Sequence, residues 1–461
     1  MAVISVIGPK GGIGKTTLSI NTASALTSAL EEKSPDNRVC LIDLDLRLPT
    51  IASLLDSHPS KTFYDLFETL ENKTYQVDVL RTLYQIFTWF HSYLEGEVKP
   101  DEKTFRKCFS VFKSLNTDNF HFEDFQFGDQ LHEIFLYRGK IHEAKDLKQI
   151  KGEIFDLDLK TIKSTLNERE KNSRPSAENY INYIEEYGLS IIGGEVPILG
   201  KRSHRRRIND PKFLVLFLEF MEEVFNRFDH VILDTPAGGV NHLSYLMTAI
   251  DQVLFVFDLS NSIAINGSID ALHSFIDYYE DFQQAFQKGQ LSGLDKAYAD
   301  RLVAHQGREA VEKSLQGKKL GIVFNRFQGQ KEIEQCLDQM REYLDILDKL
   351  DQYAGRIHIM GMIPHTKIIN ITNNRGAIFY QKDVDLSCKM DLIGYNVMTR
   401  NEECLTLQNS NQDILKYLHK NSRAGMVRKL TRLAGKFREG VSYDRKKAEH
   451  SFDQGLSVPP G

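Results

Sequence analysis

The sequence predicts an α/β fold in which a mostly parallel sheet, flanked by helices, is interrupted by an inserted all-α subdomain. Three observations support this prediction. Short runs of apolar and β-branched residues recur along the chain, as in the buried strands of parallel sheets. A glycine-rich loop directly follows the first run and opens a helical segment. Between residues 74 and 187 these runs give way to helical periodicity rich in aromatic residues.

The strands are expected where apolar runs are bounded by polar or glycine-containing segments. Seven runs meet this description: Ala2–Ile7, 39–42, Leu189–Ile192, 231–233, 253–257, 320–324 and 357–360. The segment 17–30, rich in alanine and leucine, is expected to form the first crossover helix.

The interrupted region is expected to be a helical subdomain with its own core. Two sets of apolar residues follow i, i+3, i+4, i+7 spacing, one on each side of a break at Pro100. They are Leu80, Leu83, Tyr84, Phe87, Phe90 and Leu94, and then Phe105, Cys108, Phe109, Phe112 and Leu115. Trp89 is expected to pack in the same core. The predicted domains are therefore 1–73 with 188–400 (P-loop domain), 74–187 (helical insertion) and 401–461 (C-terminal helical, basic tail).

The composition is typical of a folded chain, and the cysteines do not indicate structural disulfides or a structural zinc site. Of 461 residues, 41% are hydrophobic and 26% are charged. The five cysteines are scattered without a CxxC pair, which argues against a disulfide framework, a zinc ribbon and a redox pair. No apolar run approaches the ~18–20 residues that cross a bilayer, and no secretory pattern precedes the glycine-rich loop. We expect a cytoplasmic protein.

The glycine-rich loop PKGGIGKTT, residues 9–17, predicts a phosphate-binding site. Glycines let successive backbone N–H groups turn toward phosphate oxygens, and the following helix adds its positive end. Lys15 would contact the β- and γ-phosphates, and the Thr16 hydroxyl would ligate Mg²⁺. The expected nucleotide-binding residues of this loop are Gly11, Gly12, Ile13, Gly14, Lys15, Thr16 and Thr17. One departure from G-x-x-x-x-G-K-[ST] is Pro9, where that pattern has glycine.

Lys10 adds a second lysine to the loop, and KGGIGKTT resembles the deviant Walker A loop of the ParA/MinD family of P-loop ATPases. The resemblance implies an ATPase that closes into an ATP-sandwich homodimer, with Lys10 reaching the phosphates on the partner subunit. It also implies that the nucleotide switches association with a partner, a membrane or a DNA surface. A cation supplied across a dimer stabilises the transferring group only after closure.

Three carboxylates at strand ends are expected to face the phosphate loop, because the carboxyl ends of parallel strands border the ligand crevice. Asp43 and Asp45 end the second strand, and Asp234 ends a later apolar strand. By the resemblance, Asp45 would orient or deprotonate the attacking water and Asp43 would lie nearer Mg²⁺. The segment around Asp234 resembles Walker B, so Asp234 would hold Mg²⁺ through water, with Gly238 and Gly239 in a loop that rearranges.

The resemblance also implies a base-binding region. In the family, an Asn at the end of a strand contacts the adenine, which assigns Asn325, and a G-x-I-P turn packs near the base, which assigns Pro364. The chain departs from the family in one respect. Asp45 and Asp234 lie 189 positions apart because of the insertion, which leaves the subfamily and the cargo open. The insertion 74–187 is expected to recognise a protein partner.

A basic segment near the C-terminus contrasts with an acidic remainder. Residues 416–447 carry a charge of +9, which leaves −14 for the rest of the chain. Within 424–441 the apolar residues follow helical spacing and the basic residues share the remaining arc. Three interpretations stay open: a helix packed on the body, an interfacial helix on anionic lipid, or a contact with DNA or a protein. The two surface interpretations would make the protein peripheral to a membrane or associated with the nucleoid. The short basic run 203–207 is expected to be solvated surface, with nucleic acid as its alternative.

The favoured function is an ATPase of the ParA/MinD kind that positions or assembles other components. Two other classes of function are alternatives to it. One is a metabolic or metal-handling enzyme on the same fold, which the scattered cysteines disfavour for iron–sulfur chemistry. The other is a nucleotide-gated ATPase subunit of a larger defence or transport complex.

Overall fold

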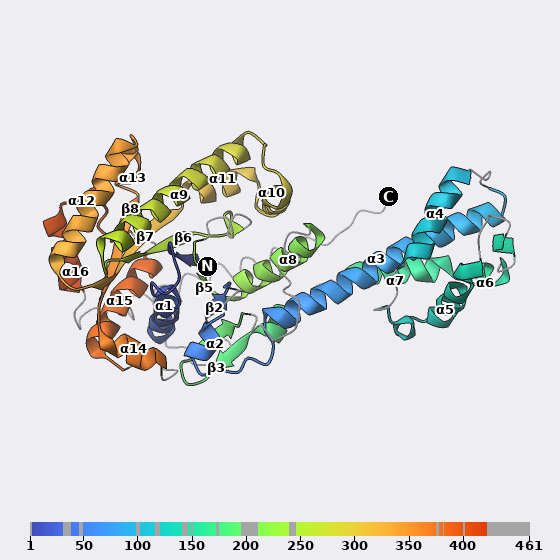
Figure 1. The fold of residues 1–461 in the computed structure, drawn as a ribbon, viewed down its shortest axis with the longest axis horizontal. Helices are drawn as coiled ribbons and strands as arrows, with labels where there is room; N and C mark the ends of the chain where they lie inside the picture. The colour runs from blue at the N-terminus through green and yellow to red at the C-terminus, as the bar shows by residue number, and fades with distance from the viewer. Residues whose placement is uncertain are drawn as a thin grey trace, which may run out of the picture. The chain divides into compact units, whose positions relative to one another are not determined.

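The computed structural model contains an eight-stranded sheet (Figure 1). Its order is β3-β4-β2-β5-β1-β6-β7-β8. The strands are β1 (Ala2–Ile7), β2 (Val39–Asp43), β3 (Asn182–Ile184), β4 (Leu189–Ile192), β5 (His230–Asp234), β6 (Gln252–Asp258), β7 (Lys319–Phe327) and β8 (Ile357–Pro364). All pairings are parallel except β3 with β4. The predicted α/β fold with a mostly parallel sheet is confirmed.

The structure describes most of the chain. The described residues are 2–30, 38–45, 49–97, 102–115, 120–140, 146–148, 151–171, 175–194, 211–238, 246–374, 378–380, 382–399 and 402–421. The basic run 203–207, Gly239 and the amphipathic segment 424–441 lie outside them, so the predictions for these segments stay predictions. Within the described ranges, no helix combines the length and the hydropathy needed to cross a membrane.

The helices of the sheet-containing part flank the sheet (Figure 1). They are α1 (Lys15–Leu30), α2 (Ile51–Leu54), α9 (Ser262–Gln287), α10 (Gly293–Gln306), α11 (Arg308–Gln316), α12 (Gln330–Ile346), α13 (Leu350–Tyr353), α14 (Lys367–Asn374), α15 (Val384–Met398) and α16 (Asn411–Asn421). Helix α8 (Pro211–Arg227) belongs to this part only from Met221 onward, and its residues up to Phe220 belong to a second, helical unit. The helix predicted over 17–30 is therefore present and begins at Lys15. The antiparallel edge strand β3 is missed by the sequence analysis, because three half-buried residues give too short a pattern to recognise.

Helix α1 is buried along most of its length, although many of its residues are polar. It packs against strands of the sheet and against α15. The side chains of Asn21 and Ser24 donate to the carbonyls of Thr17 and Ile20 at 2.8 and 2.9 Å. These hydrogen bonds within the helix satisfy polar groups that would be costly to bury unpaired. The helix that starts at the phosphate loop is thereby fixed on the sheet.

The chain divides into two compact units. One comprises Met1–Tyr64, Ala177–Ser203 and Met221–Gly461 and contains the sheet. The other comprises Asp65–Ser176 and His204–Phe220 and is helical. The helical unit begins before residue 74 because α3 (Phe63–Leu94) continues without a break from one unit into the other. Its further helices are α4 (Glu102–Ser114), α5 (Gly128–Tyr137), α6 (Lys151–Phe155) and α7 (Leu159–Lys171).

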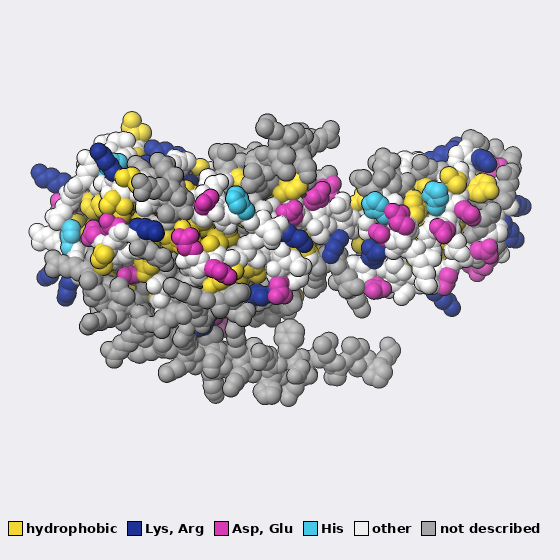
Figure 2. Space-filling model, turned by 90° about the horizontal axis from the view of Figure 1, so that it is seen from below, with side chains coloured by type: hydrophobic (Ala, Val, Ile, Leu, Met, Phe, Trp, Pro, Cys, Tyr) yellow, Lys and Arg dark blue, Asp and Glu magenta, His cyan; other side chains and the backbone are white. Residues whose placement is uncertain are grey.

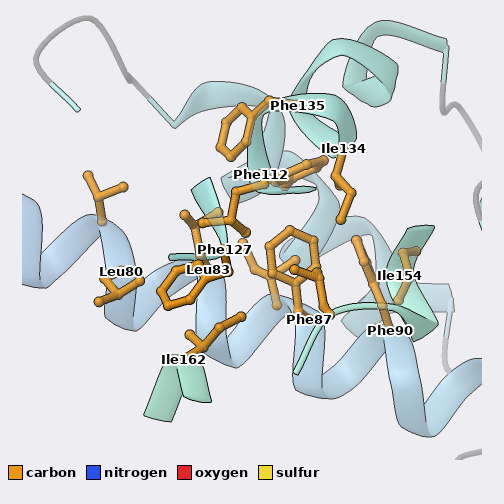
Figure 3. Packing of buried hydrophobic residues seen from close by; sticks show 14 of the residues in the cluster. Leu80, Leu83, Phe87, Phe90, Phe112, Phe127, Ile134, Phe135, Ile154 and Ile162 are labelled. Atoms are coloured by element: carbon orange, nitrogen blue, oxygen red, sulfur yellow. The ribbon is translucent and has the colours of Figure 1, made fainter. Parts of the chain in front are cut away.

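The helical unit has a hydrophobic core of its own (Figure 3). Phe112 of α4 lies at its centre, with ring centroids 5.9 Å from Phe87, 6.0 Å from Phe90 and 5.1 Å from Phe135. The aromatic residues with helical spacing are therefore core residues, as predicted, wherever their side chains are described. Trp89 is partly buried against this core. On the face shown in Figure 2, acidic and basic side chains are interspersed over this unit.

We predict that Phe112→Ala destabilises the helical unit by about 3–5 kcal/mol, because it leaves a cavity among three aromatic rings. Urea unfolding followed by the fluorescence of Trp89, the only tryptophan, measures this unit. Val111→Ala on the same helix is the control, since Val111 is 40% exposed and should change stability by less than about 0.5 kcal/mol. Equal effects of the two substitutions would contradict the described core.

Candidate functional site

The glycine-rich loop connects β1 to α1 at the carboxyl end of the sheet. Gly12 and Gly14 have φ of +74° and +95°, in the region that favours glycine. A Cβ at position 14 would also lie 2.5 Å from Asn325 Nδ2. Gly14 is therefore required both by its backbone conformation and by the close approach of β7.

A cavity of about 420 Å³ lies beside this loop, within the size range of small-molecule sites. Seven of the residues predicted to bind the nucleotide line it: Gly12, Gly14, Lys15, Thr16, Thr17, Asn325 and Pro364. Gly11 is exposed, and a Cβ added at this position would meet no other atom within 4 Å. Ile13 is buried and contributes its backbone carbonyl to the loop. The loop and the ends of β7 and β8 are thus brought together around one cavity.

Lys15 is positioned at the first residue of α1, where the helix N-terminus favours negative charge. Its side chain is buried, and Nζ donates to the carbonyl of Lys10 at 3.2 Å. Burial lowers the pKa of Lys15, and the charges of Asp234 and Asp45 oppose this effect. Both carboxylates therefore lie within electrostatic reach of the loop lysine.

Asp234 joins the end of β5 to the first turns of α1. Its Oδ2 accepts from the Thr16 hydroxyl at 2.7 Å, and its Oδ1 accepts from the Ser19 hydroxyl at 2.9 Å. Burial raises the pKa of Asp234 to about 6, although both hydroxyls and Lys15 act in the opposite direction. The carboxylate predicted from the strand end thus contacts the hydroxyl predicted from the loop.

Asp43 is fully buried and is the register partner of Asp234 on the neighbouring strand. Its oxygens accept from the backbone N–H groups of Asp45, Thr50 and Ile51 at 3.1, 3.0 and 3.2 Å. Burial and the charge of Asp234 raise the pKa of Asp43. Asp43 therefore fixes the segment that leads to α2, and its assignment to Mg²⁺ stays a prediction.

Thr50 is a cavity residue that the sequence analysis misses. Its hydroxyl donates to Thr16 Oγ1 at 3.3 Å, while its backbone N–H is bound to Asp43. Thr50 follows the predicted DLD segment by several residues and directly precedes α2. A threonine at this place gives no signal of a binding role in a single sequence.

Asn325 holds the loop as well as lining the cavity. Its Nδ2 donates to the carbonyl of Ile13 at 2.6 Å, and its Oδ1 accepts from the backbone N–H of Arg326 at 3.0 Å. Each of these atoms retains further hydrogen-bonding capacity, because an amide offers two donors and two acceptor positions. The role of Asn325 as a base contact remains a prediction.

Arg326 is a second residue that the sequence analysis misses. It has a φ of +61°, and its guanidinium donates to the carbonyl of Gly12 and lies 3.6 Å from Asp258 Oδ2. Lys10 Nζ lies 3.9 Å from the same oxygen. Asp258, at the end of β6, is 2% exposed in its side chain, whereas Lys10 is 53% exposed. The buried Asp258 carboxylate therefore lies within ion-pair distance of both Lys10 and Arg326.

The remaining residues of the cavity wall are not among the predicted site residues. These residues are Leu18, Leu54, Ser260, Ile363, His365, Thr366, Ile369 and Phe379. In the part of the chain that the structure describes, no cluster of three or more His, Cys, Asp or Glu residues could hold a metal by itself. A Mg²⁺ site here would therefore need the oxygens of a bound phosphate, as is usual for this ion.

Comparisons with known proteins identify the family of this chain. The model of the CobQ/CobB/MinD/ParA nucleotide binding domain family matches residues 4–378. A 66-residue segment is 42% identical to the antiactivator FleN of Pseudomonas aeruginosa and covers 14% of this chain. The chain thereby matches only 21% of the length of that relative.

Solved structures of similar proteins align at low identity. A chain of the MinC:MinD cell division protein complex of Aquifex aeolicus has 14% identity and a TM-score of 0.40, over 87% of this chain and 96% of its own length. The cell division ATPase MinD of Pyrococcus furiosus has 14% identity and a TM-score of 0.41, over 86% and 98%.

The family match includes the glycine-rich loop, the three strand-end carboxylates, Asn325 and Pro364, and it spans most of the chain. The resemblance inferred from the loop is confirmed at this level. The chain belongs to the CobQ/CobB/MinD/ParA nucleotide-binding domain family.

Proposed function

We propose that this protein binds ATP with Mg²⁺, hydrolyses it to ADP and phosphate, and forms an ATP-sandwich homodimer that switches association with a partner or surface. The observation that carries the proposal is the convergence of Lys15, Thr16 and Asp234 at the N-terminus of α1 beside the cavity. A cation, a hydroxyl and a carboxylate in this arrangement match the needs of a nucleoside triphosphate with its metal.

The loop and Lys15 would bind the phosphates. Backbone N–H groups at a helix N-terminus and glycines with positive φ form an anion-binding concavity. Lys15 donates to the carbonyl of Lys10 in its own loop at 3.2 Å, so its ammonium lies against the loop. A phosphate oxygen would replace that carbonyl as the acceptor.

Thr16 and Asp234 fit a magnesium site, because a hydroxyl and a carboxylate already in contact supply hard oxygen ligands. When bound, Mg²⁺ would neutralise charge on the phosphates. Thr16 would turn its oxygen to the ion, and Asp234 would accept from water bound to it. Asp43 supports this arrangement by holding Thr50 against Thr16.

Asp45 is the candidate residue for orienting or deprotonating the attacking water. It follows the end of β2, is half-buried, and contributes to the electrostatic environment of Lys15. Asn325 and Pro364 would contact the adenine, and His365 and Phe379 add aromatic surface to the same cavity.

Lys10 would act across the dimer. Within one chain it is half-exposed and near Asp258, and it does not line the cavity. To reach the phosphates of a partner subunit, Lys10 would have to move away from Asp258. Asp258 would retain its ion pair with Arg326. Closure of two subunits would thus exchange a contact within the chain for one between chains.

Two segments are proposed to contact the partner or surface. The helical insertion 74–187 is the proposed site for a protein partner, and the basic segment 416–447 is the proposed contact with a membrane or DNA. In the described part of that segment, Lys416 and Lys420 are exposed on α16. A peripheral membrane or nucleoid location would follow from either surface contact.

We predict that Lys15→Ala and Asp45→Ala separate binding from hydrolysis. Lys15→Ala should weaken ATP binding at least about tenfold, because it removes a buried charge facing the phosphates. Asp45→Ala should retain binding but lower phosphate release about 100-fold or more. Calorimetry with ATP and Mg²⁺ and a phosphate-release assay measure the two effects.

The control for both substitutions is Asp281→Ala, which removes an exposed carboxylate on α9. It should leave binding and hydrolysis unchanged. Undiminished hydrolysis in Asp45→Ala would overturn the assignment of Asp45, and unchanged affinity in Lys15→Ala would overturn the proposed phosphate site.

We predict that Lys10 and Asp258 affect dimerisation in opposite directions. Lys10→Ala should prevent the ATP-dependent dimer, whereas Asp258→Asn should strengthen it about two- to fivefold by weakening the hold on a half-exposed lysine. Sedimentation velocity with ATP and Mg²⁺, in an Asp45→Ala background that preserves the nucleotide, measures the dimer. A Lys10→Ala chain that dimerises like its parent would contradict the mechanism across subunits.

We predict a pH-dependent contribution of Asp234 to stability. Its pKa rises from 3.8 to about 6 on folding, so the folded chain favours the protonated form. This stabilisation is complete below about pH 4 and is lost as the pH rises through 6. Asp234→Asn should therefore gain stability relative to the parent between about pH 4 and pH 7, by about 1–3 kcal/mol.

Urea unfolding at several pH values without nucleotide measures the difference in stability between the parent and Asp234→Asn. Addition of MgADP should stabilise the parent and reduce this difference, because the proposed metal site favours ionised Asp234. A difference between parent and Asp234→Asn that is constant with pH would contradict the assigned protonation.

A further inference from the structure

The helical unit contains a second cavity, of about 460 Å³, which no part of the proposed ATPase mechanism uses. It lies between α3, α7 and the segment that follows the short helix Phe122–Asp124. Its lining residues all belong to the helical unit. Its volume lies in the range of sites for small molecules.

Arg169 of α7 is held in a fixed position in the wall of this cavity. Its guanidinium donates to Gln76 Oε1 and to the carbonyl of Asp124, both at 3.2 Å. It also lies over the ring of Phe125, with Cζ 4.8 Å from the centroid. An arginine has five N–H donors, so these contacts leave others for a ligand. The side chain is preorganised for binding.

Lys73 of α3 supplies a second cation to the same cavity. Burial lowers the pKa of Lys73, and the positive charge of Arg169 lowers it further. Lys73 and Arg169 therefore lie within electrostatic reach of one another in the wall of one cavity. The carboxylates of Asp124 and Glu168 also line the cavity, but both residues are exposed.

The remaining lining residues define the kind of anion. Gln126 and Thr165 add hydrogen-bonding groups, and Val77, Leu80 and Phe125 form a buried apolar wall. A guanidinium fork with a lysine suits the several oxygens of a phosphate. The apolar wall beside these cations suits a phosphate that carries a small organic group rather than free inorganic phosphate.

We propose that the cavity between α3 and α7 is a binding site for a small organic phosphate. The phosphate group lies between Lys73 and Arg169, and the organic body packs on Val77, Leu80 and Phe125. This site is separate from the proposed ATP site and does not depend on it, since its residues come from the helical unit alone.

Calorimetry on the full chain with phenyl phosphate as the probe tests this site, in the presence of saturating MgADP to occupy the other one. Two further titrations use inorganic phosphate and benzoate. We expect saturable binding of phenyl phosphate, with inorganic phosphate and benzoate each at least about tenfold weaker, because each lacks one of the two recognised parts.

Lys73→Gln and Arg169→Lys should each weaken phenyl phosphate binding about tenfold. Lys163→Gln is the matched control, because Lys163 is an exposed cation on the same helix as Arg169 and does not line the cavity. Far-UV circular dichroism and the Trp89 fluorescence verify that each variant is folded.

Three results would overturn the proposal. The first is no saturable binding of phenyl phosphate by the folded parent chain. The second is benzoate binding as tightly as phenyl phosphate, which would indicate a general anion site. The third is equal loss of binding in Lys163→Gln and in the two cavity variants.

Discussion

The contact between Asp234 and the Thr16 and Ser19 hydroxyls is the interaction on which the rest of the site depends. It joins the central strand β5 to the helix that starts at the phosphate loop. A fully buried carboxylate is costly unless its oxygens are hydrogen-bonded. Those hydroxyls therefore fix the start of α1 against the sheet, and they hold the Asp234 carboxylate beside Thr16.

Around this contact, polar side chains hold the loop and its surroundings from several strands. Asp43 binds three backbone N–H groups ahead of α2, and Asn325 and Arg326 bind carbonyls of the glycine-rich loop. Each of these side chains lies near the carboxyl end of a parallel strand. Strands β2 and β7 thus both contribute groups at the edge of the sheet where ligands bind in open α/β folds.

The sequence predicted what depends on local pattern. The buried strands, the glycine-rich loop and the strand-end carboxylates all have short signatures, and the structure brings the loop, Asn325 and Pro364 to one cavity. The sequence did not predict that Thr50 and Arg326 line the cavity or that Lys10 lies near Asp258. These contacts join segments that meet only in the folded sheet. The edge strand β3 was too short to recognise. In the insertion, aromatic periodicity revealed the core, but a cavity lined by Lys73 and Arg169 requires the packing of two helices.

In the proposed mechanism, one chain binds the triphosphate while Lys10 of a second chain completes the site. A crystal structure of the Asp45→Ala chain with ATP and Mg²⁺ tests this mechanism. We expect phosphates on the loop beside Lys15, Mg²⁺ against Thr16, and Lys10 released from Asp258 and directed at the nucleotide of the other subunit. Nucleotide bound away from the loop, or a dimer in which Lys10 remains beside Asp258 of its own chain, would contradict the mechanism.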